Sequence, residues 1–174
     1  MKLDNNSTLV LSLKLFIICL FVALGLSSLN YITKDTIAEQ VKKQKDDAMA
    51  RIITNSTEFN ALNSDETVYE ALNNGETVGY CVNVVSPKGY GGNIEMMIGF
   101  DSEFKVLGIE YISMAETPGL GMNAKTDSVF NGQFLGKKAF PDDELSAMTG
   151  ATITSKAVNY GVNLASDMIK EALK

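Results

Sequence analysis

The sequence predicts an α+β fold in which a single N-terminal transmembrane helix precedes a domain with an antiparallel sheet and a packed C-terminal helix. Three observations predict it. A run of 19 residues near the N-terminus, 15–33, carries no charge. Between residues 78 and 112, two segments alternate apolar with other residues and a third is largely apolar, as expected of strands. The segment 158–173 has apolar residues at helical spacing instead, and strands followed by a terminal helix suit an α+β domain.

The uncharged run predicts a membrane anchor. As a helix it would span about 28 Å, close to the roughly 30 Å hydrocarbon core of a bilayer. A cleaved signal peptide is the alternative, because Gly25, Ser27 and Ser28 are small enough for a processing site. The run is longer than the apolar core of a usual signal peptide and no A-x-A-like site follows it. We therefore favour an uncleaved anchor.

The charges that flank this run leave its orientation open. More lysines follow the run than precede it, so a bare count would place the C-terminal side in the cytoplasm. A large folded domain, however, crosses the membrane largely regardless of its charge. The lysines concerned are Lys2 and Lys14 before the run and Lys34, Lys42, Lys43 and Lys45 after it.

After the anchor, apolar residues continue at near-helical spacing, at Ile37, Val41, Ala48 and Ile52. This spacing predicts that the anchor continues into an amphipathic helix. The stretch 54–75 mixes polar and apolar residues without a clear period. The predicted parts of the chain are an N-terminal tail and anchor at 1–33, an amphipathic connecting helix at 34–53 and a folded domain at 54–174.

Three strands are predicted within the folded domain. Apolar residues alternate through 78–84 and again through 94–100, and a third apolar segment covers 106–112. A glycine-rich stretch at 86–92 and a short polar stretch at 101–104 separate these segments, as turns do. Short connections of this kind predict an antiparallel meander. The apolar positions of the terminal helix are Val158, Val162, Ala165, Ile169 and Leu173.

Composition excludes several classes of site. The chain has no histidine, which removes His-based acid–base catalysis and His-ligated metals. Its two cysteines, Cys19 and Cys81, form neither a zinc set nor a four-cysteine iron–sulfur set, so a redox role needs an external cofactor. We expect no metal site. The net charge of −6 argues against nucleic acid as a partner.

The stretch ETPGLG directly after the third predicted strand is the first candidate site. Proline and two glycines give it an unusual backbone path, and glycine allows a flat ligand to approach the main chain closely. An ordinary Pro-Gly turn leaving a strand is the alternative interpretation. Its residues are Glu116, Thr117, Pro118, Gly119, Leu120 and Gly121.

The stretch TGATIT, at the start of the terminal helix, is the second candidate site. Thr149 or Thr152 could simply cap the helix. A glycine-containing turn at a helix N-terminus, here Gly150 and Ala151, also exposes N–H groups and the positive end of the helix dipole to a phosphate. The hydroxyl of Thr154 would then lie in the same site as the anion. Capping and phosphate binding both remain open on these residues alone.

The order and spacing of four motifs resemble a known family. GYGGNIEMMIGFD, ETPGLG, NGQFLGK and TGATITS occur here as in flavin-carrying subunits of membrane redox pumps. The chain resembles the RnfG family, the G subunits of Rnf complexes. More distantly, it resembles the C subunits of the sodium-translocating NADH:quinone oxidoreductase. The likeness extends from about residue 30 to the C-terminus.

This resemblance implies a covalent flavin. In that family FMN is attached through its phosphate to the last threonine of the motif, which is Thr154 here, by a separate flavin transferase that uses FAD. The flavin ring is expected against the loop 116–121, while Thr149 and Thr152 help to bind the phosphate and Gly150 gives it access. The chain departs from the family pattern at Ser146, where Asp is common, and at Met114, where many relatives carry His.

The function implied is that of an electron-transfer subunit in a membrane-bound, ion-translocating ferredoxin:NAD oxidoreductase complex, without substrate turnover of its own. Its partners would be the other subunits of the complex, the flavin transferase and the lipid bilayer. The resemblance also implies one membrane span, with a cytoplasmic N-terminus and an extracytoplasmic domain. Two alternatives remain: the corresponding C subunit of the quinone-reducing pump, and a cofactor-free anchor or assembly subunit whose threonines only cap a helix.

Overall fold

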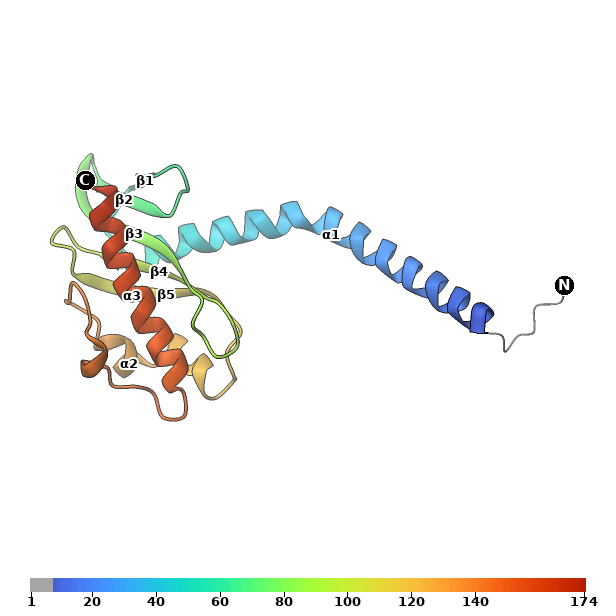
Figure 1. The fold of residues 1–174 in the computed structure, drawn as a ribbon. Coiled ribbons are helices and arrows are strands. Elements are labelled where there is room, and N and C mark those ends of the chain that lie inside the picture. Colours follow the sequence, from blue (N-terminus) through green and yellow to red (C-terminus); the bar gives the residue numbers. More distant parts are fainter. Residues whose placement is uncertain (1–7) are drawn as a thin grey trace. The chain divides into compact units, whose positions relative to one another are not determined.

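The computed structural model of the chain describes residues 8–174, and the chain divides into two compact units, Met1–Lys42 and Lys43–Lys174. Figure 1 shows the elements of the described part. In chain order they are α1 (Thr8–Ile52), β1 (Glu58–Ala61), β2 (Val68–Asn73), β3 (Glu76–Ser86), β4 (Ile94–Phe100), β5 (Val106–Met114), η1 (Gly121–Lys125), α2 (Ser128–Gly132), η2 (Asp142–Glu144) and α3 (Thr152–Ala172).

The first unit holds α1 up to Lys42. Among the described residues, α1 is the one helix that is long and apolar enough to cross a membrane, judged by length and composition. Its most apolar 18-residue window has a mean hydropathy of 2.7, and none of that window is buried. The helix runs without a break to Ile52, so no turn separates the predicted anchor from the predicted connecting helix.

The second unit is built on a five-stranded antiparallel sheet in the order β1-β2-β3-β4-β5. The three predicted strands are β3, β4 and β5, so the predicted meander is confirmed. β1 and β2 lie within the stretch 54–75, for which the sequence shows no clear period. β1 has only four residues and is largely exposed. Asn74 and Gly75, both with positive φ, connect β2 to β3, and an Asn-Gly pair is a hairpin signal that the sequence does carry.

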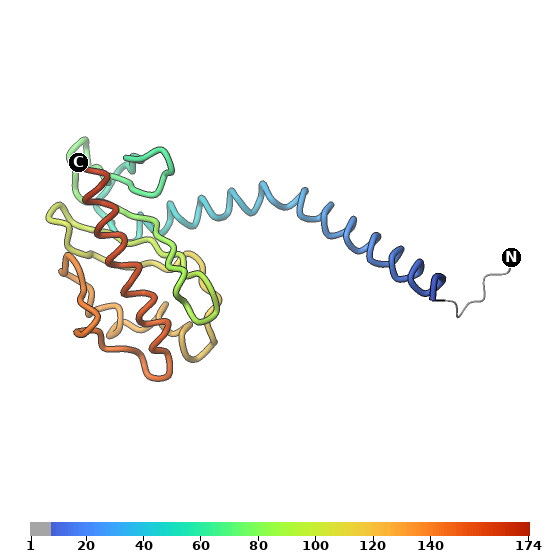
Figure 2. The backbone as a smooth tube through the Cα atoms, in the orientation of Figure 1, coloured from blue at the N-terminus to red at the C-terminus, as the bar shows by residue number. Residues whose placement is uncertain are grey.

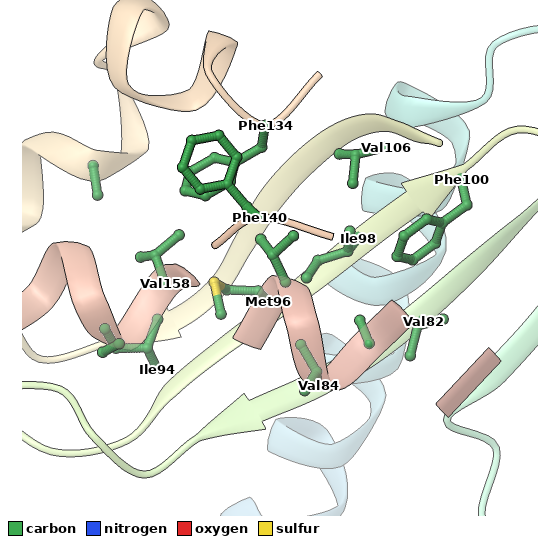
Figure 3. Packing of buried hydrophobic residues seen from close by; sticks show 14 of the residues in the cluster. Val82, Val84, Ile94, Met96, Ile98, Phe100, Val106, Phe134, Phe140 and Val158 are labelled. Carbon is green, nitrogen blue, oxygen red and sulfur yellow. The ribbon is translucent and has the colours of Figure 1, made fainter. Parts of the chain in front are cut away.

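Apolar side chains cover both faces of the sheet. On one face, alternate residues of β3 and β4 form the main core with α3, and Figure 3 shows Val82, Val84, Met96, Ile98 and Val158 packed there. The opposite face holds a smaller cluster. It consists of Cys81 and Met97 from β3 and β4, Ala71 from β2, and Ala48, Met49 and Ile53 from the end of α1 and the residue after it.

α3 packs on the main core through the predicted residues Val158, Val162, Ala165 and Ile169, all of them buried. Leu173 follows the last residue of the helix and is 42 % exposed, so it is not part of this packed face. Figure 2 shows the chain running from β5 through η1, α2 and η2 before it returns to the start of α3. Three phenylalanines of this return segment stack edge to face, which anchors it in the core: Phe130, Phe134 and Phe140.

Candidate functional site

A cavity of about 560 Å³ lies in the second unit where the β3–β4 loop, the segment after β5 and the start of α3 meet. The structure thus brings together the two sequence stretches that were singled out as candidate sites. The residues that line the cavity are Tyr90, Glu116, Thr117, Leu120, Gly121, Gly150, Ala151, Thr152, Ile153 and Thr154.

The three threonines at the start of α3 differ in their surroundings. Thr154 is 2 % exposed, and its Oγ1 donates a hydrogen bond to Glu116 Oε2 at 2.6 Å. Thr149 and Thr152 are exposed. The N-cap position belongs to Ala151, with φ −133° and ψ 38°, and no side chain caps the helix there. The simple capping interpretation of Thr149 and Thr152 is therefore wrong.

The N-terminus of α3 opens onto the cavity, because Ala151, Thr152, Ile153 and Thr154 all line it. The first N–H groups of an α-helix have no partner within the helix, and the helix dipole places partial positive charge beside them. This end of α3 is therefore suited to an anionic group next to the Thr154 hydroxyl.

The carboxylate of Glu116 links three segments that are distant in sequence. Its Oε2 accepts from Thr154 on α3, and its Oε1 accepts from the Gly91 N–H in the β3–β4 loop at 3.1 Å. Gly121 is needed where the chain passes this pair: a Cβ there would lie 2.5 Å from Thr154 Oγ1 and 2.7 Å from Glu116 Oε2. The second glycine of ETPGLG therefore makes room for the carboxylate–hydroxyl pair.

Not every predicted site residue reaches this cavity. Pro118 and Gly119 are exposed in the turn before η1, where Gly119 has φ +76° and its carbonyl accepts from Asn123 Nδ2 at 3.0 Å. Thr149 lines a neighbouring cavity of about 220 Å³ instead. In the structure, then, Pro118 and Gly119 shape the turn that presents Leu120 and Gly121.

Two lining residues, Tyr90 and Ile153, were not predicted. Tyr90 is 71 % exposed and stands in the glycine-rich loop between β3 and β4. The sequence carried a signal for it, because a large aromatic residue between glycines in a turn has no core to fill. Ile153 is 53 % exposed in the first turn of α3, where an apolar residue is likewise unexplained by packing.

The two positions that depart from the family pattern have structural roles. Met114 belongs to the main core at the end of β5. The backbone of Ser146 pairs with the Gln133 side chain: the Ser146 N–H donates to Oε1 at 3.0 Å, and Nε2 donates to the Ser146 carbonyl at 3.3 Å. The Ser146 residue itself lines the smaller cavity beside Asp127 and Thr149.

Clusters of metal-ligating side chains and buried thiols are two further features of residues 8–174 that bear on metal or redox chemistry. These residues contain no group of three or more His, Cys, Asp or Glu side chains that could hold a metal ion. Cys81 is fully buried on the far face of the sheet, and burial raises the pKa of its thiol to about 12. A thiol with so high a pKa is unreactive at neutral pH.

Comparison with known proteins identifies the family. The chain is 36% identical over 175 residues to the G subunit of the proton-translocating ferredoxin:NAD(+) oxidoreductase complex of Clostridium ljungdahlii, covering 95% of this chain and 94% of the relative. The chain belongs to the RnfG family. A second member, the G subunit of the Na(+)-translocating ferredoxin:NAD(+) oxidoreductase complex of Acetobacterium woodii, is 31% identical over 192 residues, covering 94% of this chain and 92% of that protein.

Within this member of the RnfG family, residues 89–167 match the FMN-binding domain family. These residues include all three segments that meet at the Glu116–Thr154 pair. The crystal structure of Shewanella oneidensis NqrC is also similar, with 17% sequence identity and a TM-score of 0.48 over 68% of this chain and 73% of that one.

Proposed function

We propose that this chain is the FMN-carrying electron-transfer subunit of a membrane-bound, ion-translocating ferredoxin:NAD oxidoreductase complex, and that Thr154 holds the FMN through a phosphoester. Its relatives are subunits of such complexes, and all residues that line the cavity lie within the range that matches the FMN-binding domain family. The observation that carries the proposal is the buried Thr154 hydroxyl at the N-terminus of α3, held by Glu116 at the wall of the cavity.

The residues present fit such a group. The cavity volume of about 560 Å³ lies within the range of about 300–1,000 Å³ that small-molecule sites occupy. The first turn of α3 lines the cavity and can bind a phosphate beside Thr154. Tyr90, Leu120 and Ile153 supply exposed apolar surface to the same cavity, as a flat aromatic ring requires.

When bound, FMN supplies the electron-transfer chemistry, and the chain supplies position and environment. Covalent attachment through Thr154 would keep the cofactor in place on the outer side of a membrane, where a dissociated flavin is lost by dilution. The flavin transferase and the other subunits of the complex are the partners that this function requires. We propose one membrane span within α1, a cytoplasmic N-terminus and an extracytoplasmic domain.

The proposal predicts that Thr154→Ala abolishes covalent flavin while the protein stays folded. Losing this hydrogen bond and leaving part of the Glu116 carboxylate unpaired should lower the free energy of unfolding by about 1–3 kcal/mol. That is too little to unfold a domain whose stability is about 5–15 kcal/mol. In-gel flavin fluorescence of the denatured full-length protein, after expression with its transferase, measures attachment.

Thr126→Ala is the matched control, because it removes an exposed threonine hydroxyl that lies outside the cavity. It should keep the covalent flavin. Flavin that persists on denatured Thr154→Ala would contradict the proposal and move the attachment to another residue. Absence of covalent flavin from the natural protein would favour a cofactor-free anchor or assembly role instead.

A further inference from the structure

Glu116 is a buried carboxylate whose surroundings differ from those of the other acidic residues. It is 4 % exposed, and none of the ion pairs among residues 8–174 involves it. Burying an unpaired carboxylate costs free energy, so such a group needs hydrogen-bond donors. It has two: the Gly91 N–H on Oε1 at 3.1 Å and the Thr154 hydroxyl on Oε2 at 2.6 Å.

Glycines enclose this carboxylate from two loops. A Cβ at Gly89, in the β3–β4 loop, would lie 2.6 Å from Glu116 Oε1. A Cβ at Gly121 would lie 2.7 Å from Oε2 and 2.5 Å from Thr154 Oγ1. Both contacts are shorter than real Cβ atoms show, so the two loops leave space for the carboxylate and the hydroxyl to meet.

The contact has the geometry of a nucleophile and its base. A hydroxyl–carboxylate distance of about 2.5–2.7 Å is typical of a charge-assisted hydrogen bond, and a general base lies within about 2.6–3.2 Å of the proton that it accepts. A threonine hydroxyl is a weak nucleophile that an adjacent base must activate. Among the described residues, Thr149 and Thr152 have no such carboxylate partner.

We infer that Glu116 accepts the proton of the Thr154 hydroxyl when the flavin is attached, and that this contact selects Thr154 from the neighbouring threonines. The inference rests on the proposed function. Thr154 Oγ1 forms a bond to the FMN phosphorus of FAD, the pyrophosphate P–O bond breaks, AMP leaves with the bridging oxygen, and the hydroxyl proton passes to Glu116 Oε2. The role belongs to maturation, separate from the electron transfer of the finished protein.

Glu116→Gln tests the inference, because the amide keeps the size of the side chain and an oxygen acceptor but is a very weak base. Full-length protein made without the transferase is incubated with purified flavin transferase and FAD, and intact-protein mass spectrometry follows the added FMN. General base catalysis contributes about 10²–10⁴-fold, so we expect the maximal attachment rate to fall by at least about 10²-fold. The KM for the protein substrate should stay unchanged, whereas a disturbed fold would raise it.

Glu110→Gln is the matched control, since it also removes one negative charge but on β5, outside the cavity. It should be modified at the natural rate. Attachment to Glu116→Gln at the natural rate would overturn the inference and assign the proton to a group of the transferase. If Glu116→Gln fails to fold, as judged by circular dichroism, Glu116→Asp decides. Its side chain is one methylene shorter, so its carboxylate no longer reaches the Thr154 hydroxyl and the attachment rate should fall. A folded Asp variant with an undiminished rate overturns the inference too.

The same experiment separates this inference from the proposed function. If the natural protein acquires no FMN from transferase and FAD, and none is found on protein from its own cells, the proposed function fails. If the natural protein acquires FMN at Thr154 and Glu116→Gln does so equally fast, only the role of Glu116 fails.

Discussion

The hydroxyls of Thr149, Thr152 and Thr154 are close in sequence but different in chemistry. Only Thr154 is buried, and it alone donates to Glu116, which lies 38 positions earlier. The first turn of α3 separates them, because Thr152 at the first helical position is exposed whereas Thr154, two residues later, is buried. At the residue scale, reactivity is therefore expected where a hydroxyl, a carboxylate and a helix N-terminus coincide.

The two glycines of ETPGLG should respond differently to substitution. Gly121→Ala places a methyl group within 2.5 Å of Thr154 Oγ1, so the pair must separate and covalent flavin loading should fall. Overpacking of this kind costs about 1–3 kcal/mol. Gly119 faces open space but has φ +76°, so Gly119→Ala should cost about 1–2 kcal/mol of stability and leave loading nearly unchanged.

Loading is measured by flavin absorbance of denatured protein, and stability by urea unfolding of the full chain. Gly132→Ala is the control, because a Cβ there meets no atom within 4 Å and the residue has no positive φ. Normal loading of Gly121→Ala would show that the Glu116–Thr154 contact is not needed for attachment.

At the scale of the element, α3 uses two of its sides. One packs the apolar core, and the other carries polar residues that bind residues 138–148, the last part of the return segment. Asn163 binds both backbone groups of Phe140: its Oδ1 accepts from the N–H at 2.8 Å and its Nδ2 donates to the carbonyl at 2.9 Å. The other polar contacts join Ser155 to the Met148 N–H, Asn159 to Asp142 and Ser166 to the Lys138 carbonyl.

Asn163→Ala should therefore destabilise the domain although it removes no apolar contact. Two hydrogen bonds are lost, each of which contributes about 0.5–1.5 kcal/mol, so the free energy of unfolding should fall by about 1–3 kcal/mol. Lys170→Ala serves as the control on the same helix, because its ion pair with Asp167 is exposed and such pairs contribute about 0–1 kcal/mol. Equal unfolding midpoints for the two variants in urea would contradict this account of α3.

At the scale of the whole molecule, one continuous helix joins the apolar N-terminal run to the folded unit. Its last turns belong to that unit, where Gly99 of β4 gives room to Ile52: a Cβ on Gly99 would overlap the Ile52 side chain. The end of α1 is therefore part of the domain core on the face opposite α3. A span by the apolar run would tether the flavin domain to the membrane.

Topology can be tested with one introduced cysteine. Ser64 lies in the turn between β1 and β2 and is not buried, so Ser64→Cys should react with a membrane-impermeant thiol reagent in intact cells if the domain is extracytoplasmic. The unsubstituted protein is the control, because Cys81 is buried and its raised pKa, about 12, leaves almost no thiolate. Labelling of Ser64→Cys only after lysis would place the domain in the cytoplasm.

The sequence by itself determined the elements whose burial has a local period. β3 and β4 show apolar alternation, β5 is a largely apolar segment between turns, α3 shows a helical apolar pattern, and the uncharged run marks the apolar part of α1. The glycine and threonine motifs likewise named most of the residues that line the cavity. Such signals are readable because each depends on neighbours within a few positions along the chain.

Only the tertiary structure decided which of these residues meet. Three features depend on residues dozens of positions apart. They are the hydrogen bond between Thr154 and Glu116, the space left by Gly89 and Gly121, and the presence of Tyr90 in the cavity wall. The polar side of α3 was equally hidden, because most of its partners are backbone groups of a segment without regular period. Local periodicity reports which side of an element is buried, whereas the packing of the sheet against α3 sets what lies opposite each side chain.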